Sequence, residues 1–438
     1  MKKKKLIVLT TVLLLISFVF AACSQQTETA ETKQTADYSK FTDEAKECLE
    51  CHALETPGIV SAWDASAHAI GEVSCIDCHQ VEPGSPMELK GIEDHEDLDV
   101  SLSMLVPANV CQECHEDQVE QFHASGHERA YLQMEAKESM QALMYYHEGQ
   151  QNEELGGAPA ETGCFQCHGS RIEVDETGHP TPDTYPASGI GNVYPNGEIG
   201  NCVVCHTRHS FSIAEARRPE ACASCHLGPD HPDIEIYEAS KHGQIYHSDG
   251  DNWVWDRAPG EWEPGDYTAP TCATCHMSGI GDLEMSHNIT ERLYWNLWAP
   301  LSKPRTEADV FDTYYGDGEK GRELMTQVCL NCHSSALVEG HFASSDKAVE
   351  LYNQEYFLEA DAMRTDLAEK GLLNDNPWKD EFEVVYYYLW HHEGRRARQG
   401  AIMAGADWAH WHGFFEIMQD IYKLEELYKE RIETGAGN

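Results

Sequence analysis

The chain has 438 residues and is strongly acidic, because 75 Asp and Glu side chains face only 31 Lys and Arg, giving a formal net charge of −44. A surface of this sign repels phosphate groups, so neither nucleic acid nor an anionic lipid surface is expected as a partner. The 17 cysteines predict disulfides, a metal or a covalently bound cofactor.

The first forty residues have the pattern of an export signal followed by a tether. Four lysines at positions 2–5 precede an apolar run at 6–20, which is short for a membrane span and typical of a secretory signal. Small residues before Cys23 resemble a bacterial lipobox. We therefore predict a lipoprotein signal at 1–22, lipidation of Cys23 and a flexible tether at 23–40. An ordinary signal peptide, with Cys23 not lipidated, is the alternative.

Eight Cys-x-x-Cys-His motifs follow. Their thiols are Cys48/Cys51, Cys75/Cys78, Cys111/Cys114, Cys164/Cys167, Cys202/Cys205, Cys222/Cys225, Cys272/Cys275 and Cys329/Cys332. The histidines after them are His52, His79, His115, His168, His206, His226, His276 and His333. Two thiols at this spacing can each bond a vinyl group of a haem, and the histidine can bind its iron from one side. Zinc ribbons or redox dithiols are the alternative, but they do not require a histidine after every second cysteine.

These motifs leave only Cys23 outside, so no cysteine remains for a disulfide, and eight c-type haems are predicted. Covalent haem attachment in bacteria resembles a process of the outer side of the cytoplasmic membrane. We therefore expect an exported protein, held by its lipid at that membrane face or in the periplasm.

The motif density predicts the fold. One haem per roughly fifty residues leaves little room for a separate polypeptide core. We predict a mainly α chain with a haem-packed core and few strands: a region at 41–300 with the first seven haems, and a continuous helical part at 301–438 with the eighth. Helical spacing is expected in four segments: 116–146, 346–370, 377–399 and 413–434. The Pro- and Gly-rich segment 169–201 predicts a surface loop.

Whether one iron is open to substrate does not follow from counting. A haem with two histidine ligands passes electrons, whereas one with a single protein ligand can bind a small molecule. Sixteen of the 24 histidines lie outside the motifs, which is enough to close every iron.

The order and spacing of the motifs, with the segments CHTRHSFS, GPDHP, SKHG, SHNITERLYW and WHHEGRRARQGAIM, resemble the octahaem hydroxylamine oxidoreductases over nearly the whole mature chain. The resemblance implies that the fourth haem, on Cys164, Cys167 and His168, is catalytic and has His168 as its only axial protein ligand. It also implies a homotrimer.

The same resemblance implies second axial ligands for the other seven haems. They are His68, His95, His127, His209, His242, His287 and His392, with His123 and His391 competing for two of these places. Asp230 and His231, in GPDHP, match the acidic residue and histidine that line the catalytic pocket. If His231 instead bound an iron, every haem would be an electron carrier.

The chain departs from the family at Trp408, which lies between Gly405 and Gly413. Oxidising members have a tyrosine there that is cross-linked to the catalytic haem, and an indole lacks the phenol oxygen for that bond. The resemblance implies that members without this tyrosine run as reductases.

We therefore predict reduction of nitrite or hydroxylamine to ammonium, with electrons from a redox partner protein or a quinol-linked donor. Oxidation of hydroxylamine or hydrazine, and electron transfer without catalysis, are the alternatives. Lys241 and the group of Arg395, Arg396 and Arg398 are candidates for a local positive cluster that attracts an anion, but pairing of the arginines with haem propionates is the favoured explanation.

Overall fold

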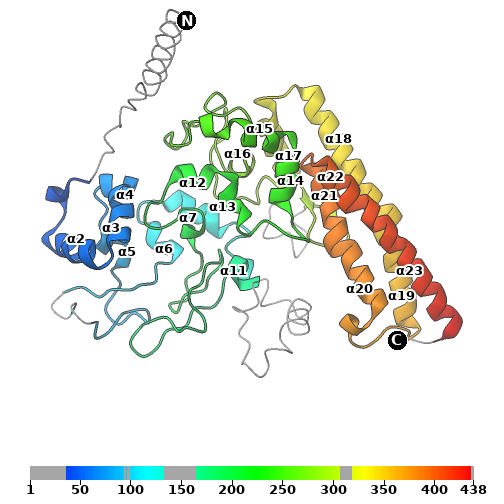
Figure 1. Cartoon of the computed structure of the whole chain (residues 1–438), viewed down its shortest axis with the longest axis horizontal. Helices are drawn as coiled ribbons and strands as arrows, with labels where there is room; N and C mark the ends of the chain where they lie inside the picture. Colours follow the sequence, from blue (N-terminus) through cyan, green and yellow to red (C-terminus); the bar gives the residue numbers. More distant parts are fainter. Residues whose placement is uncertain (1–35, 93–94, 96–98, 133–163, 306–317, 436–438) are drawn as a thin grey trace, which may run out of the picture. The chain divides into compact units, whose positions relative to one another are not determined.

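The computed structural model describes residues 36–92, 95, 99–132, 164–305 and 318–435, and the chain divides into two compact units, Met1–Ser74 and Cys75–Asn438 (Figure 1). Cys23 therefore lies outside the described residues. The division falls between the first and second haem motifs, and the boundaries expected at 41 and 301 stay predictions. No helix within the described residues is long and apolar enough to cross a membrane.

The first unit is a small helical module around the first haem motif. It contains η1 (Tyr38–Lys40), α2 (Asp43–Glu55), α3 (Pro57–Asp64) and α4 (Ala67–Ile70). Thr42 caps α2, because its hydroxyl accepts a hydrogen bond from the backbone N–H of Ala45 at 3.2 Å. Phe41 and Trp63 are buried, with ring centres 5.4 Å apart. This packing holds the start of α2, which carries His52, against α3, and α3 in turn contacts α4, which carries His68.

The haem-motif region of the second unit consists of short helices joined by turns. They are α5 (Cys75–His79), α6 (Ala108–Cys111), α7 (Glu116–His123), α11 (Cys164–His168), η5 (Cys202–Val204), α12 (Ile213–Arg217), α13 (Pro219–Ala223), α14 (Asp233–Ala239), α15 (Lys241–Asp249), η6 (Gly250–Asn252) and α16 (Cys272–His276). In the described residues, the only sheet is the antiparallel pair β1 (Trp295–Asn296) and β2 (Lys303–Pro304). The prediction of a mainly α fold with few strands is confirmed.

The helix expected at 116–146 is interrupted: α7 ends at His123, and helical residues resume at 130–132. The Ser125 hydroxyl donates to the carbonyl of Phe122 at 2.7 Å, and the chain then forms turns from Ala124 to Arg129. A serine that bonds the preceding backbone competes with helix continuation, so the apolar spacing overstated the helix. The segment 133–163 lies outside the described residues.

The segment 169–201 is a loop with turns, as expected, but part of it is core. Ile172 and Tyr194 are buried against Met87 and Leu105. The loop also packs closely on α11, since a Cβ on Gly189 would lie 2.0 Å from the backbone nitrogen of Gly169. Its glycines permit this approach to the fourth haem motif. The prediction of a surface loop is therefore wrong for Ile172 and Tyr194. The frequent Pro and Gly residues of the segment gave no sign that these two apolar side chains are buried.

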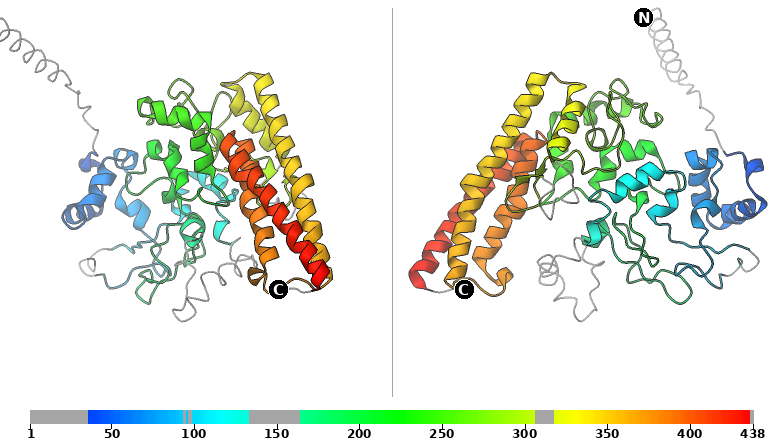
Figure 2. Two further views of the ribbon diagram at one scale, coloured as in Figure 1. Left: turned by 45° about the vertical axis from the view of Figure 1, so that its right-hand side comes forward. Right: turned by 180° about the vertical axis from the view of Figure 1, so that it is seen from behind.

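The C-terminal part is a bundle of long helices, as predicted (Figure 2). Its elements are α17 (Gly318–Leu330), α18 (Ser335–Leu351), η7 (Tyr352–Phe357), α19 (Leu358–Glu369), η8 (Pro377–Lys379), α20 (Glu381–Tyr387), η9 (Tyr388–Glu393), α21 (Gly394–Ile402), α22 (Ala406–Ala409), η10 (His410–Phe414) and α23 (Phe415–Thr434). Three of them, η7, η9 and η10, are π-helical turns within longer helices, a feature frequent at functional sites. The segment η9 contains His391 and His392.

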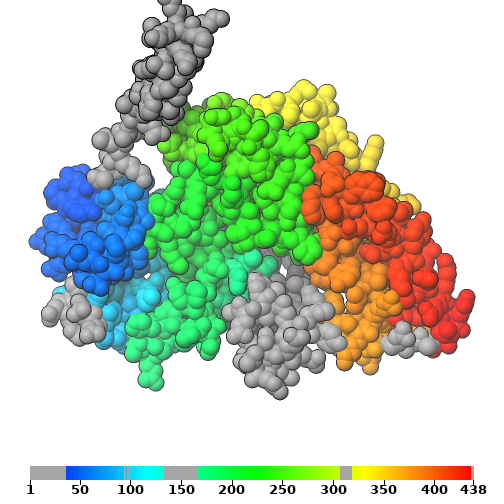
Figure 3. Space-filling model, viewed as in Figure 1, coloured from blue at the N-terminus to red at the C-terminus, as the bar shows by residue number. Residues whose placement is uncertain are grey.

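The bundle has its own apolar core, and it lies against the region of the fifth to seventh haem motifs. Leu389, Ile417 and Leu424 are fully buried in this core. In the space-filling view the orange and red helices adjoin the green segment (Figure 3). The contact involves α22 and α14, because a Cβ on Gly405 would lie 2.7 Å from the Ile236 side chain. The bundle therefore supports the element that follows Asp230 and His231.

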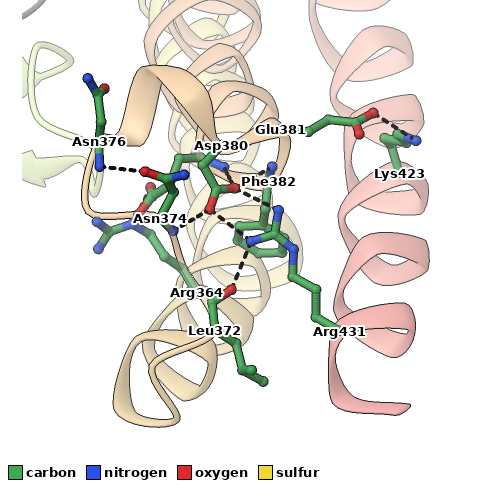
Figure 4. A network of polar contacts seen from close by, with 10 residues as sticks. Arg364, Leu372, Asn374, Asn376, Asp380, Glu381, Phe382, Lys423 and Arg431 are labelled. Atoms are coloured by element: carbon green, nitrogen blue, oxygen red, sulfur yellow. Dashed lines mark hydrogen bonds and ion pairs between the residues drawn. The ribbon is translucent and has the colours of Figure 1, made fainter. Parts of the chain in front are cut away.

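A buried ion pair fastens two helices of the bundle (Figure 4). Both carboxylate oxygens of Asp380 lie 2.8 Å from guanidinium nitrogens of Arg431, and the two side chains are 0% and 3% exposed. Asp380 also caps α20 by accepting from the backbone N–H of Phe382 at 2.9 Å. One carboxylate therefore fixes both the start of α20 and the end of α23.

Acid is expected to weaken this bundle. Burial disfavours the charged form of Asp380, but hydrogen bonds from Arg431 and from the backbone N–H groups of Asn374 and Glu383 outweigh it and lower the pKa of Asp380. A lowered pKa contributes stability above the unfolded-chain value of about 4, and this contribution is lost as the pH falls through the folded-state pKa. Far-UV circular dichroism should show a steeper loss of thermal stability below that pH for the wild type than for Asp380→Ala. Identical acid profiles would contradict this.

Candidate haem centres and catalytic pocket

Each described Cys-x-x-Cys-His motif forms a helical turn. The backbone N–H of the histidine donates to the carbonyl of the first cysteine, at 2.8 Å for His115, 2.9 Å for His226 and His333, and 3.1 Å for His206. Residues three and four apart share one helix face. Both thiols and the imidazole therefore face the same side, as attachment to a single haem requires.

No motif cysteine whose exposure the structure gives is fully buried. Cys51, Cys114 and Cys332 are exposed, and Cys225 is half-buried, with its sulfur 3.7 Å from the hydroxyl oxygen of Ser224. This differs from the usual setting of free cysteine, which is among the most buried residue types. A thiol bonded to a haem vinyl group would face the haem edge and not the polypeptide interior, so this exposure agrees with the predicted attachment. No disulfide joins the described cysteines, and haem attachment at all sixteen motif cysteines stays a prediction.

Three motif histidines lie opposite a predicted second ligand. The ring centres are 6.3 Å apart for His79 and His209, 6.4 Å for His206 and His287, and 6.0 Å for His242 and His333. Two imidazoles bound to opposite sides of one metal at about 2 Å place their ring centres roughly 6 Å apart. These pairs fit the second, fifth and eighth haems.

A fourth pair concerns the sixth motif. The ring centres of His127 and His226 are 6.1 Å apart. Burial, followed by the charge of His226, lowers the pKa of His127 to about 3, so its imidazole is neutral, the form that binds iron. The competing His123 lies 3.8 Å from Glu128 instead. The geometry therefore favours His127 over His123 at this haem. The ring centre of His231 lies at a similar distance from that of His226, 6.2 Å, so the choice of His127 over His231 stays a prediction from the family resemblance.

The other predicted second ligands are not paired so simply. His68 lies in α4, in the unit of the first haem motif, and His95 lies between residues outside the description. His391 is buried and stacked on Tyr387 at 4.4 Å, whereas half-buried His392 stacks on Tyr388 at 4.9 Å. Burial is the main reason that the pKa of His392 falls to about 4. Ligands for the first, third and seventh haems stay predictions.

The loop between His226 and α14 carries Asp230 and His231. The Nδ1–H of His231 donates to the carbonyl of Leu227 at 2.8 Å, and Asp230 Oδ1 lies 3.8 Å from the same nitrogen. A carbonyl only accepts, so the proton of the neutral ring is on Nδ1, and Nε2 holds the lone pair. The ring of Trp298 lies edge-on to His231, at 5.9 Å.

Two arginines of α21 hold this loop. Arg395 Nη1 lies 3.3 Å from Asp230 Oδ2, and Arg396 Nε donates to the carbonyl of Pro229 at 2.8 Å. His391 Nε2 is 4.0 Å from the same oxygen of Asp230. Sequence reasoning considered these arginines as partners of haem propionates and missed that Arg395 pairs with Asp230. The contact spans 165 residues, so no local pattern predicts it.

Arg398 and Lys241 are engaged elsewhere. Arg398 is buried over the ring of Tyr352, 4.0 Å from its centre, and its Nε donates to the carbonyl of Gly394 at 2.6 Å. Lys241 donates to Gln244 at 3.0 Å on an exposed surface. Of the four predicted cations, Arg395 and Arg396 lie nearest the Asp230–His231 loop.

The fourth haem motif is an electrostatic neighbour of this loop. The pKa of His168 is lowered mainly by burial and next by the charge of His231, whereas a hydrogen bond that the imidazole makes to the backbone of Ala130 and the charge of Asp230 act in the opposite direction. The fold therefore places His168 within electrostatic range of Asp230 and His231. In the sequence these groups are about 60 residues apart, and only the resemblance joined them.

Trp408 lies in α22, half-buried, with its ring centre 4.7 Å from that of His412. No tyrosine occurs in the sequence between Tyr388 and Tyr422. The departure from the oxidising members therefore holds for this whole stretch of the chain.

Comparison with known proteins identifies the family of the chain. A family model described as "Seven times multi-haem cytochrome CxxCH" matches residues 71–378, and one described as "Cytochrome c554 and c-prime" matches residues 19–80. The chain belongs to the multihaem cytochromes c, and iron-containing c-type haem is its cofactor. The count of eight haems and the role of the fourth stay predictions.

A curated relative from Kuenenia stuttgartiensis is similar to much of the chain. The chain is 29% identical over 324 residues to a "Probable nitrite reductase-hydroxylamine oxidoreductase fusion protein" of Kuenenia stuttgartiensis. The match covers 66% of this chain and 34% of that protein, so the chain spans about a third of its relative's length.

Solved structures share the fold. A "Hypothetical multiheme protein" has a TM-score of 0.75 and 24% identity, and the match covers 89% of this chain and 96% of that one. The reducing HAO-like protein complex of Kuenenia stuttgartiensis has a TM-score of 0.62 and 22% identity, covering 89% and 86%. The resemblance to the hydroxylamine oxidoreductase family is confirmed.

Proposed function

We propose that this chain is an oxidoreductase that reduces nitrite or hydroxylamine to ammonium at the haem attached to Cys164 and Cys167. The observation that carries the proposal is the proximity of His168 to the Asp230–His231 loop, in a chain that has Trp408 in place of the cross-linking tyrosine. When bound, the fourth haem supplies an iron that takes the nitrogen atom of the substrate, and the other haems supply electrons.

His231 is the proton donor. Nitrite reduction to ammonium consumes six electrons and eight protons and releases two waters, and hydroxylamine reduction consumes two electrons and three protons and releases one water. The bond from Nδ1 to Leu227 leaves Nε2 as the nitrogen that exchanges protons. After protonation the imidazolium is stabilised by the Asp230 carboxylate, 3.8 Å from Nδ1.

Arg395 positions Asp230 to stabilise the imidazolium of His231. Its guanidinium donates a hydrogen bond to Asp230 Oδ2 at 3.3 Å and so holds the carboxylate beside His231. It also provides positive charge near the loop of a protein that is otherwise strongly negative. Since salt screens distant surface charges beyond about 10 Å, this local charge matters more to an approaching anion than the net charge does.

Ligand binding tests the proposal against an electron-transfer protein in which every iron is closed. Adding nitrite or hydroxylamine to the oxidised holoprotein should change the paramagnetic resonance and visible spectra of one haem per chain. Absence of any spectral change with either ligand would favour the electron-transfer alternative.

Replacing Trp408 by Tyr tests the direction of turnover. If the fourth haem accepts the phenol, we expect a haem–tyrosine adduct by mass spectrometry and a gain of about tenfold in hydroxylamine oxidation relative to reduction. Trp408→Phe is the matched control, because it is aromatic and has no phenol oxygen. Equal behaviour of the Tyr and Phe variants would contradict this prediction.

We also propose that the protein is exported, anchored by a lipid on Cys23, and assembles as a homotrimer supplied by a redox partner or quinol-linked donor. The supporting features are the sequence pattern at 1–23 and the family resemblance. Mass spectrometry of the mature N-terminus tests the lipid.

A further inference from the structure

The Nδ1 atom of His226, the histidine of the sixth motif, faces a carboxylate. His226 Nδ1 lies 2.8 Å from Asp233 Oδ2. If Nε2 binds the iron, Nδ1 carries the proton and donates it to this oxygen, because an ionised carboxylate only accepts.

Other motif histidines have different acceptors. His79 Nδ1 donates to the carbonyl of Ser103 at 2.8 Å, and His52 Nδ1 lies 2.9 Å from the hydroxyl oxygen of Thr56. These two partners are neutral, whereas Asp233 is charged. The sixth haem therefore differs from the first and second in the charge behind its proximal ligand.

The Asp230–His231 loop positions Asp233 for this contact. The backbone N–H of Asp233 donates to the carbonyl of His231 at 2.8 Å, and that of Ile234 donates to the carbonyl of His226 at 3.0 Å. The chain thus folds back, so that the first residue of α14 meets the motif histidine. One short segment carries the sixth proximal ligand, the pocket histidine and the carboxylate.

We propose that Asp233 is a positioning residue that fixes the His226 ring and lowers the reduction potential of the sixth haem. An acceptor with full negative charge draws the Nδ1 proton, increases the electron density on Nε2 and so stabilises ferric over ferrous iron. The inference depends on His226 as an axial ligand and not on the substrate, so failure of nitrite reduction would leave it intact.

The reduction potential of the sixth haem matters because this haem lies near His231. The ring centre of His231 lies 6.2 Å from that of His226, so the sixth haem adjoins the pocket. A haem of low potential at that place passes electrons towards the catalytic haem more favourably than it keeps them. The segment that presents His231 would thereby also promote electron delivery in the reducing direction.

Redox titration of Asp233→Asn in the holoprotein tests the proposal without any substrate. Asn keeps the size and an acceptor oxygen but removes the charge. The ferrous-to-ferric ratio of one haem at a fixed potential should rise at least tenfold, which is about 59 mV for a one-electron couple.

Glu238→Gln is the matched control. It removes one charge from the same helix, but its side chain is half exposed and faces His247 at 3.7 Å. A shift in Asp233→Asn no larger than in this control, or equal in all haems, would overturn the proposal.

Asp233→Glu gives a second comparison that does not depend on how the Asn variant folds. It retains the charge, so its haem potentials should stay within about tenfold of the wild-type ferrous-to-ferric ratios. Loss of the low-potential haem in Asp233→Glu, with full haem content by absorbance, would also overturn the proposal.

Discussion

Replacing His231 by Ala is expected to lower the rate of nitrite and hydroxylamine reduction by about 10²- to 10⁴-fold, the usual contribution of a positioned acid or base. The reason is the loss of the imidazole whose Nδ1 is held by the carbonyl of Leu227 beside Asp230. Haem attachment does not involve this side chain, so all haems should be retained. Steady-state rates with a low-potential reductant measure the effect.

His247→Ala provides the comparison. His247 lies in α15 with its side chain 53% exposed, and its loss should leave turnover unchanged. If His231→Ala keeps the wild-type rate, proton supply by this residue is wrong. If His231→Ala also abolishes a spectral feature of bis-histidine haem, His231 is an iron ligand and the pocket assignment fails.

Replacing Asp380 by Ala is expected to destabilise the C-terminal bundle by about 3–5 kcal/mol. The variant leaves the Arg431 guanidinium buried without its carboxylate, and it removes the cap of α20 (Figure 4). Resistance of the holoprotein to proteolysis between α19 and α23, measured against denaturant, reports the change.

The same two helices offer an exposed ion pair as control. Glu381 Oε1 and Lys423 Nζ are 3.0 Å apart, with side chains 54% and 41% exposed. Surface pairs contribute roughly 0–1 kcal/mol, so Glu381→Ala should have a small effect. Equal destabilisation by the two variants would mean that burial of the Asp380 pair adds nothing.

Local sequence was sufficient for the haem motifs and for the bundle. A Cys-x-x-Cys-His motif places its three groups on one face within a single helical turn, and the C-terminal segments carry enough periodic apolar residues to mark their helices. The helix at 116 was overextended because spacing ignores the competition from Ser125.

Contacts between distant residues could not be read from the sequence. His79 meets His209 across 130 residues, and Arg395 meets Asp230 across 165. Such pairs depend on how the loops return, and many histidines compete for each iron. Asp233 is only seven residues from His226 in the sequence. Its carboxylate reaches the imidazole because the chain turns at His231, where the backbone N–H of Asp233 donates to the carbonyl of His231.

The most direct test of the account is turnover by the purified holoprotein in both directions. Nitrite and hydroxylamine are supplied with a low-potential reductant, and hydroxylamine and hydrazine with an oxidant. The account predicts fast formation of ammonium and little oxidation. Dominant oxidation would contradict the role assigned to Trp408, and no turnover in either direction would contradict catalysis at the fourth haem.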